Sequence, residues 1–443
     1  MTSLLLKIRE SRLARDSFWS VFGNGLGNVL LLLAGILIAR LLQKDLYGEY
    51  GMVKTTMFYL AAFSTFGLGY TSTKFVAHAI EQRRRDTVAI VRSAMGITLV
   101  SCTVMCVLLL VFADRLAAYI DAPQLAPAFR YLGVIMICKA VSTTQTGILA
   151  GYKDFRSLGV NNIVSGAVLL AASVPLTCFY SVGGSLAALL LSQAVLCLFN
   201  ARSLWRVMRR EVLDPRATDQ PTNQPAAEGH YTRKILQFSF PVALQELSYT
   251  VCNWGAMLLV TKYATIGEVG IYSAATQWGA IILFIPTLLQ NVVLSYLSGL
   301  NRDARRHNRI VWQMIVVNLV CACIPLVFIV LLSGVIVSFY GATFAGLRIV
   351  LNVYALSTVP MCLTNVLQAD LLARGRNWLL FALRTGRDTV IITTVYLLFA
   401  RLHTEHAALH LALVNVAAYS VFVVLLAVLL WRIVKADNIS NRI

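Results

Sequence analysis

Several charged side chains, Glu246 among them, lie inside long apolar runs of the sequence, where charge is costly. Lys139 lies near the middle of "YLGVIMICKAVSTTQ", and Arg384, Arg387 and Asp388 lie in "FALRTGRDTV", one to two turns inside another apolar run. On insertion scales, a charge at the centre of a membrane helix costs about 2.5–3.5 kcal/mol. Residues kept at this cost are candidates for a functional site, and a cavity lined by cations suits an anionic substrate.

Other polar residues of the apolar runs are weaker candidates. The full set of predicted substrate-binding residues is Lys139, Arg384, Arg387, Lys54, Asn24, Asn28, Asn253 and Gln277. The predicted coupling or ion-pairing residues are Glu246 and Asp388. Glu246 lies one turn from Tyr249 and two turns from Asn253, so helical spacing puts all three on one face.

Each candidate also has a purely structural interpretation. Arg384 and Asp388, four residues apart, can neutralise one another, and the arginines are near enough to a helix end to snorkel to water. Lys139 is too deep to snorkel easily, so it either faces a cavity or pairs with a carboxylate such as Glu246. Glu246 is then either that partner or a site that couples transport to a proton or another cation. Asparagines in such helices often serve only to pack one helix on another.

The composition predicts that the elements holding these residues span a membrane. Hydrophobic residues make up 58% of the 443 residues and charged residues 13%, against about 25% charged residues in soluble domains. A bilayer-spanning helix needs about 20 mainly apolar residues. Twelve runs qualify: 17–41, 52–72, 89–112, 129–151, 157–180, 184–204, 237–261, 266–296, 311–338, 348–371, 379–401 and 407–432. We therefore expect an all-α polytopic membrane protein with about 12 transmembrane helices.

The distribution of positive charge predicts the orientation of these helices. The formal net charge is +18, and the basic residues gather in alternate connections, such as "KFVAHAIEQRRRD" and "NRDARRHNR". Cytoplasmic segments of membrane proteins are enriched in Lys and Arg. We therefore expect a multi-pass protein of a bacterial inner membrane with both termini in the cytoplasm. The same distribution argues against nucleic acid as a partner.

The sequence offers no motif for bound nucleotides or metals. It has neither GxxxxGK[ST] nor HExxH, the patterns of a P-loop and of a zinc-binding helix. Its nine cysteines all fall inside the predicted spans, where they are interpreted as small apolar packing residues. We expect no cofactor, no metal site and no catalytic residue.

Two short patterns recur about half a chain apart. Gly48-Glu49-x-Gly51 follows the first span and Gly267-Glu268-x-Gly270 follows the seventh. A second pair, "QTGILAGYKDF" and "QADLLARGRNW", follows the fourth and tenth spans in the same order. Both pairs favour an internal duplication. Parallel repeats related by an axis along the membrane normal recur in transporters.

The duplication predicts two six-helix lobes related by a pseudo-two-fold repeat. We expect a lobe at 1–208, a cytoplasmic linker at 209–235 that is polar and contains three prolines, and a second lobe at 236–443. In each lobe the glycine-bearing corner is expected to turn the chain tightly. Such a corner would serve as a wall or gate element between the first two helices.

Three segments resemble a known family. "ARLLQKDLYGEYGMV", "FGLGYTSTKFVAH" and "GILAGYKDFRSLG" are similar to the pattern of polysaccharide exporters. These are oligosaccharide flippases of the multidrug/oligosaccharidyl-lipid/polysaccharide exporter superfamily, and O-antigen flippases are the nearest kind. The resemblance covers essentially the whole chain in length, span count and motif order.

The resemblance implies a V-shaped bundle of two six-helix lobes that translocates an undecaprenyl-pyrophosphate-linked oligosaccharide to the outer leaflet by alternating access. The expected partners are this lipid-linked glycan, the bilayer, and a polysaccharide polymerase with its assembly proteins. Arg and Lys would grip the pyrophosphate, while Asn, Gln, Tyr and Trp would suit the glycan.

Two other functions fit the same sequence less well. A multidrug or small-molecule antiporter of the same superfamily typically places an acidic cation site in the first lobe, whereas the first span here offers Asn24 and Asn28 and no carboxylate. A membrane enzyme such as a polymerase or glycosyltransferase should show a sizeable outer loop or paired catalytic carboxylates, and every predicted outer loop is short.

Overall fold

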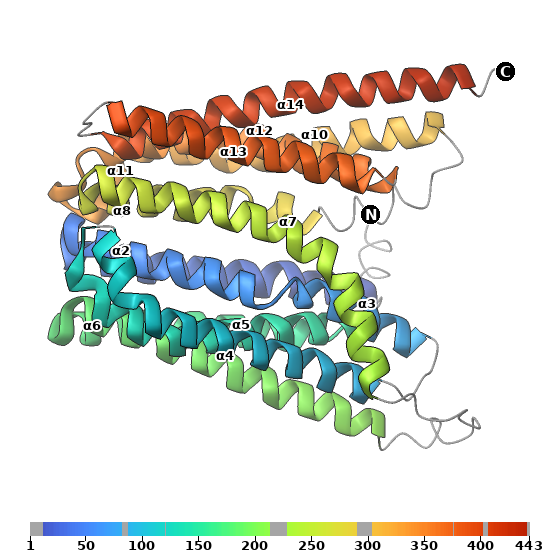
Figure 1. The fold of residues 1–443 in the computed structure, drawn as a ribbon, viewed down its shortest axis with the longest axis horizontal. Coiled ribbons are helices and arrows are strands. Elements are labelled where there is room, and N and C mark those ends of the chain that lie inside the picture. Colours follow the sequence, from blue (N-terminus) through green and yellow to red (C-terminus); the bar gives the residue numbers. More distant parts are fainter. Residues whose placement is uncertain are drawn as a thin grey trace, which may run out of the picture. The chain divides into compact units, whose positions relative to one another are not determined.

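The computed structural model describes residues 12–81, 87–119, 121–212, 228–289, 304–374, 376–401 and 406–440. Within these ranges the regular elements are all helices (Figure 1). The α-helices are α2 Arg12–Ser64, α3 Leu68–Glu81, α4 Thr87–Tyr119, α5 Ala126–Gly151, α6 Phe155–Val212, α7 Glu228–Tyr263, α8 Ile266–Ile282, α10 Ala304–Leu331, α11 Ser333–Tyr340, α12 Leu347–Ala373, α13 Asn377–Arg401 and α14 Ala407–Ser440. Two short 3-10 helices, η1 Pro123–Leu125 and η3 Ala342–Phe344, complete the set.

The helices agree with the predicted number of membrane spans. Seven stretches are long and apolar enough to cross a membrane, and those in α2 and α6 run for 44 and 56 residues. Each of these two helices is interrupted by one non-helical residue, Gln43 (φ 61°) in α2 and Ser181 (φ 51°) in α6. Since about 20 residues suffice for one crossing, α2 and α6 are each long enough for two spans. α7 and α13, with 36 and 25 residues, are also long enough to cross, and α8 begins a further predicted span at Ile266. The protein is an all-α polytopic membrane protein.

Two predicted spans are interrupted by a turn of the backbone, and in a third, predicted at 266–296, α8 ends at Ile282. The span predicted at 52–72 is broken, because Phe66 (φ 46°) and Gly67 (φ 68°) adopt left-handed backbone angles between α2 and α3. The span predicted at 311–338 is divided where α10 ends at Leu331 and α11 begins at Ser333. Apolar content alone marks how long a run is, and it does not show where the backbone turns inside the run.

The chain forms two compact units, each described by itself. Unit 1 comprises Met1–Leu41 and Met52–Trp254, and unit 2 comprises Leu42–Gly51 and Gly255–Ile443. Part of the predicted linker at 209–235 lies outside the described residues, so the division into lobes at this linker remains a prediction.

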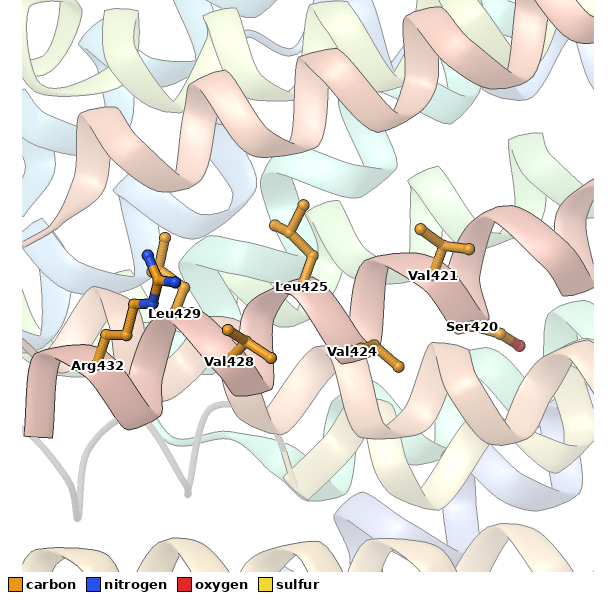
Figure 2. Close-up of a pocket in the computed structure, with 7 residues that line it drawn as sticks. All are labelled: Ser420, Val421, Val424, Leu425, Val428, Leu429 and Arg432. Carbon is orange, nitrogen blue, oxygen red and sulfur yellow. The ribbon is translucent and has the colours of Figure 1, made fainter.

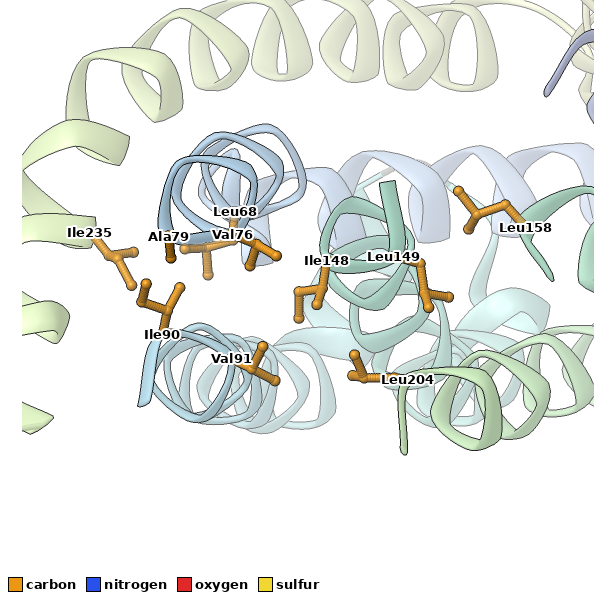
Figure 3. Close-up of a cluster of buried hydrophobic side chains, with 10 residues drawn as sticks. All are labelled: Leu68, Val76, Ala79, Ile90, Val91, Ile148, Leu149, Leu158, Leu204 and Ile235. Carbon is orange, nitrogen blue, oxygen red and sulfur yellow. The ribbon is translucent and has the colours of Figure 1, made fainter. Parts of the chain in front are cut away.

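Unit 1 is built around α5, which packs against α3, α4 and α6. A cluster of ten buried apolar side chains joins these helices near one end (Figure 3): Leu68, Val76, Ala79, Ile90, Val91, Ile148, Leu149, Leu158, Leu204 and Ile235. Ile235 comes from α7, so the first turns of α7 are anchored in the same cluster. This packing fixes α5, the helix that carries Lys139.

Unit 2 is built around α12, which packs against α14, α10 and α8. One of its apolar clusters, from α12, α13 and α14, contains Leu367, Leu371, Leu380, Phe422, Leu426 and Leu430. In Figure 1 these three helices lie together as the orange and red ribbons. The cluster holds α13 against α14, and α13 carries the predicted arginines.

The glycines of the repeated corner do not make the turn that was predicted for them. Gly48 and Gly51 are helical, and the break falls earlier, at Gln43. Their role is close packing: a Cβ on Gly48 would lie 1.9 Å from the carbonyl oxygen of Ile266, and one on Gly270 would lie 2.5 Å from that of Lys44. The two copies of the motif therefore pack on each other inside unit 2, and only residues without a side chain allow this approach.

The glutamate of the second copy has a separate role. Glu268 is buried, and its Oε2 accepts a hydrogen bond from the backbone N–H of Ala408 at 3.0 Å. Ala408 is the second residue of α14, where backbone N–H groups have no partner within the helix. The Glu268 carboxylate thus caps α14 and complements the positive end of its dipole.

Candidate functional site

Lys139 is partly buried and lies in the middle of α5, a helix of unit 1. Its Nζ lies 5.0 Å from the centroid of the Phe58 ring, over the ring face. The ring attracts a cation through its quadrupole but provides no counter-charge. Among the side chains that the structure describes, Lys139 makes no ion pair with a carboxylate. The side chain of Glu246, its predicted partner, lies outside the described part, although its backbone belongs to α7.

A second lysine lies close to this contact. Lys54 is on α2 one turn before Phe58, so the two side chains share a face of the helix. Between them in sequence, Thr56 accepts a hydrogen bond from Trp254 Nε1 at 3.1 Å. Unit 1 therefore places Lys54 on the same face of α2 as Phe58, the ring that Lys139 contacts, and Thr56 and Trp254 on the opposite side. We call Lys54, Phe58 and Lys139 the lysine cluster.

Three predicted asparagines lie elsewhere. Asn24 accepts a hydrogen bond from the Nδ2 of Asn162 on α6, next to Gly23 and Gly27, where α2 and α6 are in close contact. Asn28 is exposed. Asn253 donates from Nδ2 to the carbonyl oxygen of Tyr249 in its own helix, at 2.8 Å. Asn24 thus contributes to the packing of α2 on α6, and Asn253 provides a hydrogen-bond donor to a backbone carbonyl of its own helix.

Gln277 lies in unit 2 beside a buried aromatic group. Its Oε1 accepts a hydrogen bond from the Tyr47 hydroxyl at 3.4 Å, and Tyr47 packs against Tyr50 and Phe344 at centroid distances of 5.8 Å. The next residue, Trp278, donates from Nε1 to the hydroxyl of Tyr340 at 3.0 Å. These aromatic residues were not predicted as a group, because they come from segments far apart in the sequence.

The charged residues of α13 form a pair different from the one their spacing indicated. Arg387 donates from Nε and Nη2 to Asp388 Oδ1 at 2.8 and 2.6 Å, and both side chains are buried. The Arg387 guanidinium also lies 4.4 Å from the Tyr419 centroid and 4.8 Å from that of Phe422. Arg387 is therefore neutralised and enclosed.

Arg384 is left without the partner that the spacing of four residues predicted. Its Nε is buried and has no hydrogen-bond partner in the described structure, and the same holds for Asp388 Oδ2. Buried donors without partners are costly. Of the two predicted arginines, Arg384 is the one with a buried donor, Nε, that has no partner in the described structure.

A buried charged cluster in unit 2 was not predicted from the sequence. His307 Nε2 lies 2.6 Å from Asp370 Oδ1, and Arg374 Nε donates to the same oxygen at 2.8 Å. The spacing of four residues between Asp370 and Arg374 was a usable sign of an ion pair on one helix. Nothing in the sequence indicated that His307 would join them from another helix.

One groove of the described structure lies along α14, and its lining is mostly apolar (Figure 2). It has a volume of about 610 Å³ and is lined by Ser420, Val421, Val424, Leu425, Val428, Leu429 and Arg432. None of the predicted substrate-binding residues belongs to it. Its apolar, exposed side chains suit contact with lipid chains, with Arg432 at one end.

Solved structures of transporters share this fold. A multidrug resistance MATE family transporter of the MOP superfamily, in an inward-facing conformation, matches with a TM-score of 0.74 at 16% identity, over 92% of this chain and 96% of that one. A MOP superfamily transporter from Pyrococcus furiosus, described as having a binding pocket of reverse polarity, matches with a TM-score of 0.66 at 18% identity, over 94% of both chains. At these identities the likeness shows the fold alone.

Sequence relatives point to polysaccharide transport. The succinoglycan biosynthesis transport protein ExoT of Rhizobium meliloti (strain 1021) is 22% identical over 274 residues, which is 62% of this chain. The match spans about half, 51%, of that relative's length. A family model described as polysaccharide biosynthesis protein matches residues 13–285. Because this match covers more than half of the chain, the protein belongs to the polysaccharide biosynthesis protein family.

Proposed function

We propose that this protein is a flippase that moves an undecaprenyl-pyrophosphate-linked oligosaccharide from the cytoplasmic to the outer leaflet of a bacterial inner membrane. Family membership supports a transporter for polysaccharide biosynthesis. The lysine cluster supports an anionic substrate. Its central observation is that the Lys139 ammonium is held within a membrane helix over a Phe58 ring and makes no ion pair among the described side chains.

The lysine cluster suits a phosphate group attached to a lipid. An ammonium placed in a membrane interior is costly, and an incoming phosphate oxygen offsets that cost with a charge-assisted hydrogen bond. The Phe58 ring is 39% exposed, so the face beside Lys139 is partly open. Lys54, one turn away on α2, provides a second positive charge for a group that carries more than one negative charge.

In unit 2, Arg384 is the proposed contact for an anionic group. Arg387 is instead assigned to holding α13 against α14, because Asp388 accepts from its Nε and Nη2 and its guanidinium packs on Tyr419 and Phe422. Transport proceeds by alternating access: the cytoplasm-facing state admits the headgroup, the lipid tail stays in the bilayer, and the outward-facing state releases the glycan.

The test is surface glycan production in a strain whose own transporter is deleted. Lys139→Ala should lower surface glycan about tenfold or more, because a hydrogen bond to a charged group contributes about 1.5–3 kcal/mol. Lys139→Arg should retain a substantial part of it. Arg130→Ala is the matched control, because Arg130 is exposed and pairs with Asp114 on the surface of the same unit. All three variants must reach the membrane in equal amounts, and undiminished surface glycan with Lys139→Ala would refute the role of Lys139.

A vesicle assay separates the two candidate substrates. Proteoliposomes containing lipid-linked glycan should expose it to an added glycosidase faster when the protein is present. Export of cationic drugs without glycan movement would favour the small-molecule antiporter instead.

A further inference from the structure

A third short pattern recurs about half a chain apart, near the ends of α6 and α14. Residues 204–209 read "LWRVMR" and residues 430–435 read "LWRIVK". The first copy follows the sixth predicted span and the second copy closes the twelfth, so the two hold corresponding places in the predicted repeat. We call each copy a tryptophan–arginine motif.

The leucine of each motif fixes the rotation of its helix. Leu204 belongs to the apolar cluster of unit 1 that contains Ile148 (Figure 3), and Leu430 belongs to the cluster of unit 2 that contains Leu371. Both leucines are 6% exposed. Ile148 and Leu371 are themselves matching residues of the second repeated pair of segments. Each unit therefore seats its motif in the same way.

The tryptophan of each motif is exposed and carries a cation over its ring. Trp205 is 60% exposed and Trp431 is 62% exposed. One turn further on, the Arg209 guanidinium carbon lies 5.2 Å from the Trp205 centroid, and Lys435 Nζ lies 5.3 Å from the Trp431 centroid. The face of an indole attracts a cation in this position. The two units thus repeat a contact as well as a sequence.

Each motif presents two exposed cations on one side of its helix. The arginine after the tryptophan is exposed in both copies. It lies three residues before the cation that covers the ring, and residues at this spacing are neighbours on a helix surface. The ion pairs between described residues involve other side chains. Within the described part of the chain, no carboxylate therefore neutralises these four cations, which are Arg206, Arg209, Arg432 and Lys435.

The residue types of the motif are those of a membrane interface. Tryptophan is enriched where headgroups meet hydrocarbon, and basic residues are enriched on the cytoplasmic side, where we predict both motifs to lie. Anionic lipids of the cytoplasmic leaflet attract basic residues at this depth. An arginine binds phosphate oxygens with two parallel hydrogen bonds, and a lysine adds a point charge. Two cations one turn apart can therefore hold one phosphate group.

A groove leads from the motif of α14 along the helix (Figure 2). It runs from Ser420 to Arg432 and has a volume of about 610 Å³. This stretch of helix extends about 18 Å at 1.5 Å per residue. One leaflet is about as deep, because the hydrocarbon core of a bilayer is about 30 Å thick. A lipid whose phosphate lies at Arg432 can therefore lay an acyl chain along the groove.

The corresponding face of α6 is also apolar and exposed. In the register of the two motifs, Leu198 matches Val424 and Phe199 matches Leu425, and all four side chains are exposed. The motif of α6 is thus preceded by an apolar face like that of α14.

We propose that each tryptophan–arginine motif binds an anionic phospholipid of the cytoplasmic leaflet. The phosphate lies against the two cations, the indole lies at the level of the headgroups, and an acyl chain follows the apolar face of the helix. A phospholipid of the bilayer suits the motif better than the transported lipid does, because the site is built once in each unit and a carried molecule needs one passage. Bound lipid holds the ends of α6 and α14 at the membrane surface. This binding does not depend on which substrate the protein transports.

Native mass spectrometry of the full-length protein tests these sites. The protein is released from micelles that contain equal amounts of phosphatidylglycerol and phosphatidylethanolamine, and we expect the wild type to retain two molecules of phosphatidylglycerol. Arg432→Gln with Lys435→Gln should remove one of them, and Arg206→Gln with Arg209→Gln should remove the other, each through a loss of affinity of about tenfold or more. Equal retention of the two lipids by the wild type, or unchanged retention in both double variants, would overturn the proposal.

A matched control separates a defined site from an effect of net charge. Arg115→Gln with Arg130→Gln also removes two exposed positive charges, on the side predicted to be outside, and Arg115 lies over an aromatic ring, 5.5 Å from the Phe112 centroid. This variant should retain both phosphatidylglycerol molecules, and a loss equal to that of the motif variants would refute the sites. All the substituted side chains are exposed, so every variant should unfold near the wild-type temperature in lipid-free detergent.

A competition experiment distinguishes the two sources of lipid phosphate. Undecaprenyl pyrophosphate added in equal amount should leave the bound phosphatidylglycerol in place. Displacement of both phosphatidylglycerol molecules would assign the motifs to the transported lipid and would contradict the proposal.

Discussion

Two arginine–aspartate pairs of this chain show how environment sets the strength of a contact between single residues. Arg387 and Asp388 are 5% and 2% exposed, whereas Arg130 and Asp114 are 54% and 65% exposed. Both pairs have short distances, 2.6 Å and 2.8 Å. In the exposed pair, water screens the charges and replaces the lost partner. In the buried pair, removal of one partner leaves a charge with no water to solvate it.

The two pairs therefore predict opposite responses to the same substitution. Asp388→Asn should lower the free energy of unfolding by about 3–5 kcal/mol, the usual cost of breaking a buried pair. Asp114→Asn should change it by about 0–1 kcal/mol. Thermal unfolding in detergent, followed by tryptophan fluorescence, gives the comparison. Equal effects of the two substitutions would contradict the structural role assigned to Arg387.

A double variant checks that the cost comes from the unpaired charge. Arg387→Leu with Asp388→Leu removes both charges, and its stability should lie closer to wild type than that of Asp388→Asn. This follows because apolar replacement of a buried pair is often neutral or stabilising. A double variant as unstable as the single one would point to lost packing against Tyr419 and Phe422.

At this scale the sequence predicted which residues matter better than what they contact. The depth of Lys139 and Arg387 in apolar runs marked both as costly charges. The contact of Lys139 with Phe58 depends on packing between distant segments. The contact of Arg387 with Asp388 depends on the choice of rotamer, whereas the spacing had favoured Arg384 as the partner of Asp388. Neither is encoded in local periodicity.

At the scale of elements, the helix contact through Gly48 and Gly270 shows what the repeated motif specifies. A Cβ on Gly48 would meet the backbone of Ile266, which cannot rotate away as a side chain can. Close approach of helices through small residues is common in membranes. The sequence revealed the repeat and its glycines, but the turn at Gln43 was missed because a non-glycine residue with positive φ has no sequence signal.

Substitution of helical glycines should thus have opposite effects at two sites. Gly48→Ala should destabilise the protein by about 1–3 kcal/mol, the range for overpacking. Gly96→Ala should be neutral or stabilise it by about 0.5–1 kcal/mol, since a Cβ there meets nothing within 4 Å and alanine favours helix. The same unfolding assay measures both variants. An unchanged free energy of unfolding in Gly48→Ala would show that the two helices can move apart at this contact at little cost.

For the whole molecule, the composition and run lengths were enough to predict the class of fold. Apolar runs of helix length follow directly from bilayer thickness, so about twelve spans could be counted. Interruptions such as the one at Phe66–Gly67 could not be predicted, because they depend on where neighbouring helices allow the backbone to turn. The side on which each loop lies rests on charge alone.

Reporter fusions test the predicted orientation. Alkaline phosphatase, active only outside the cytoplasm, should be active when fused after Ala122, between the third and fourth spans. It should be inactive when fused after Gln220 in the central segment, and a green fluorescent protein fused there should fluoresce. The physical reason is the excess of Lys and Arg on the cytoplasmic side. Phosphatase activity at both positions would invalidate the twelve-span topology.

The ten residues Leu42–Gly51 belong to unit 2, while the chain on both sides of them belongs to unit 1. Cleavage of the polypeptide between its halves would therefore not yield two self-sufficient fragments. A fragment of residues 228–443 would leave the backbone of Ile266 and Gly270 uncovered, whereas residues 12–212 would carry Tyr47 and Tyr50 without the aromatic side chains that enclose them. We expect each fragment to fold only when the other is produced in the same cell. Their assembly would then depend on residues Leu42–Gly51 of the first fragment, which complete unit 2.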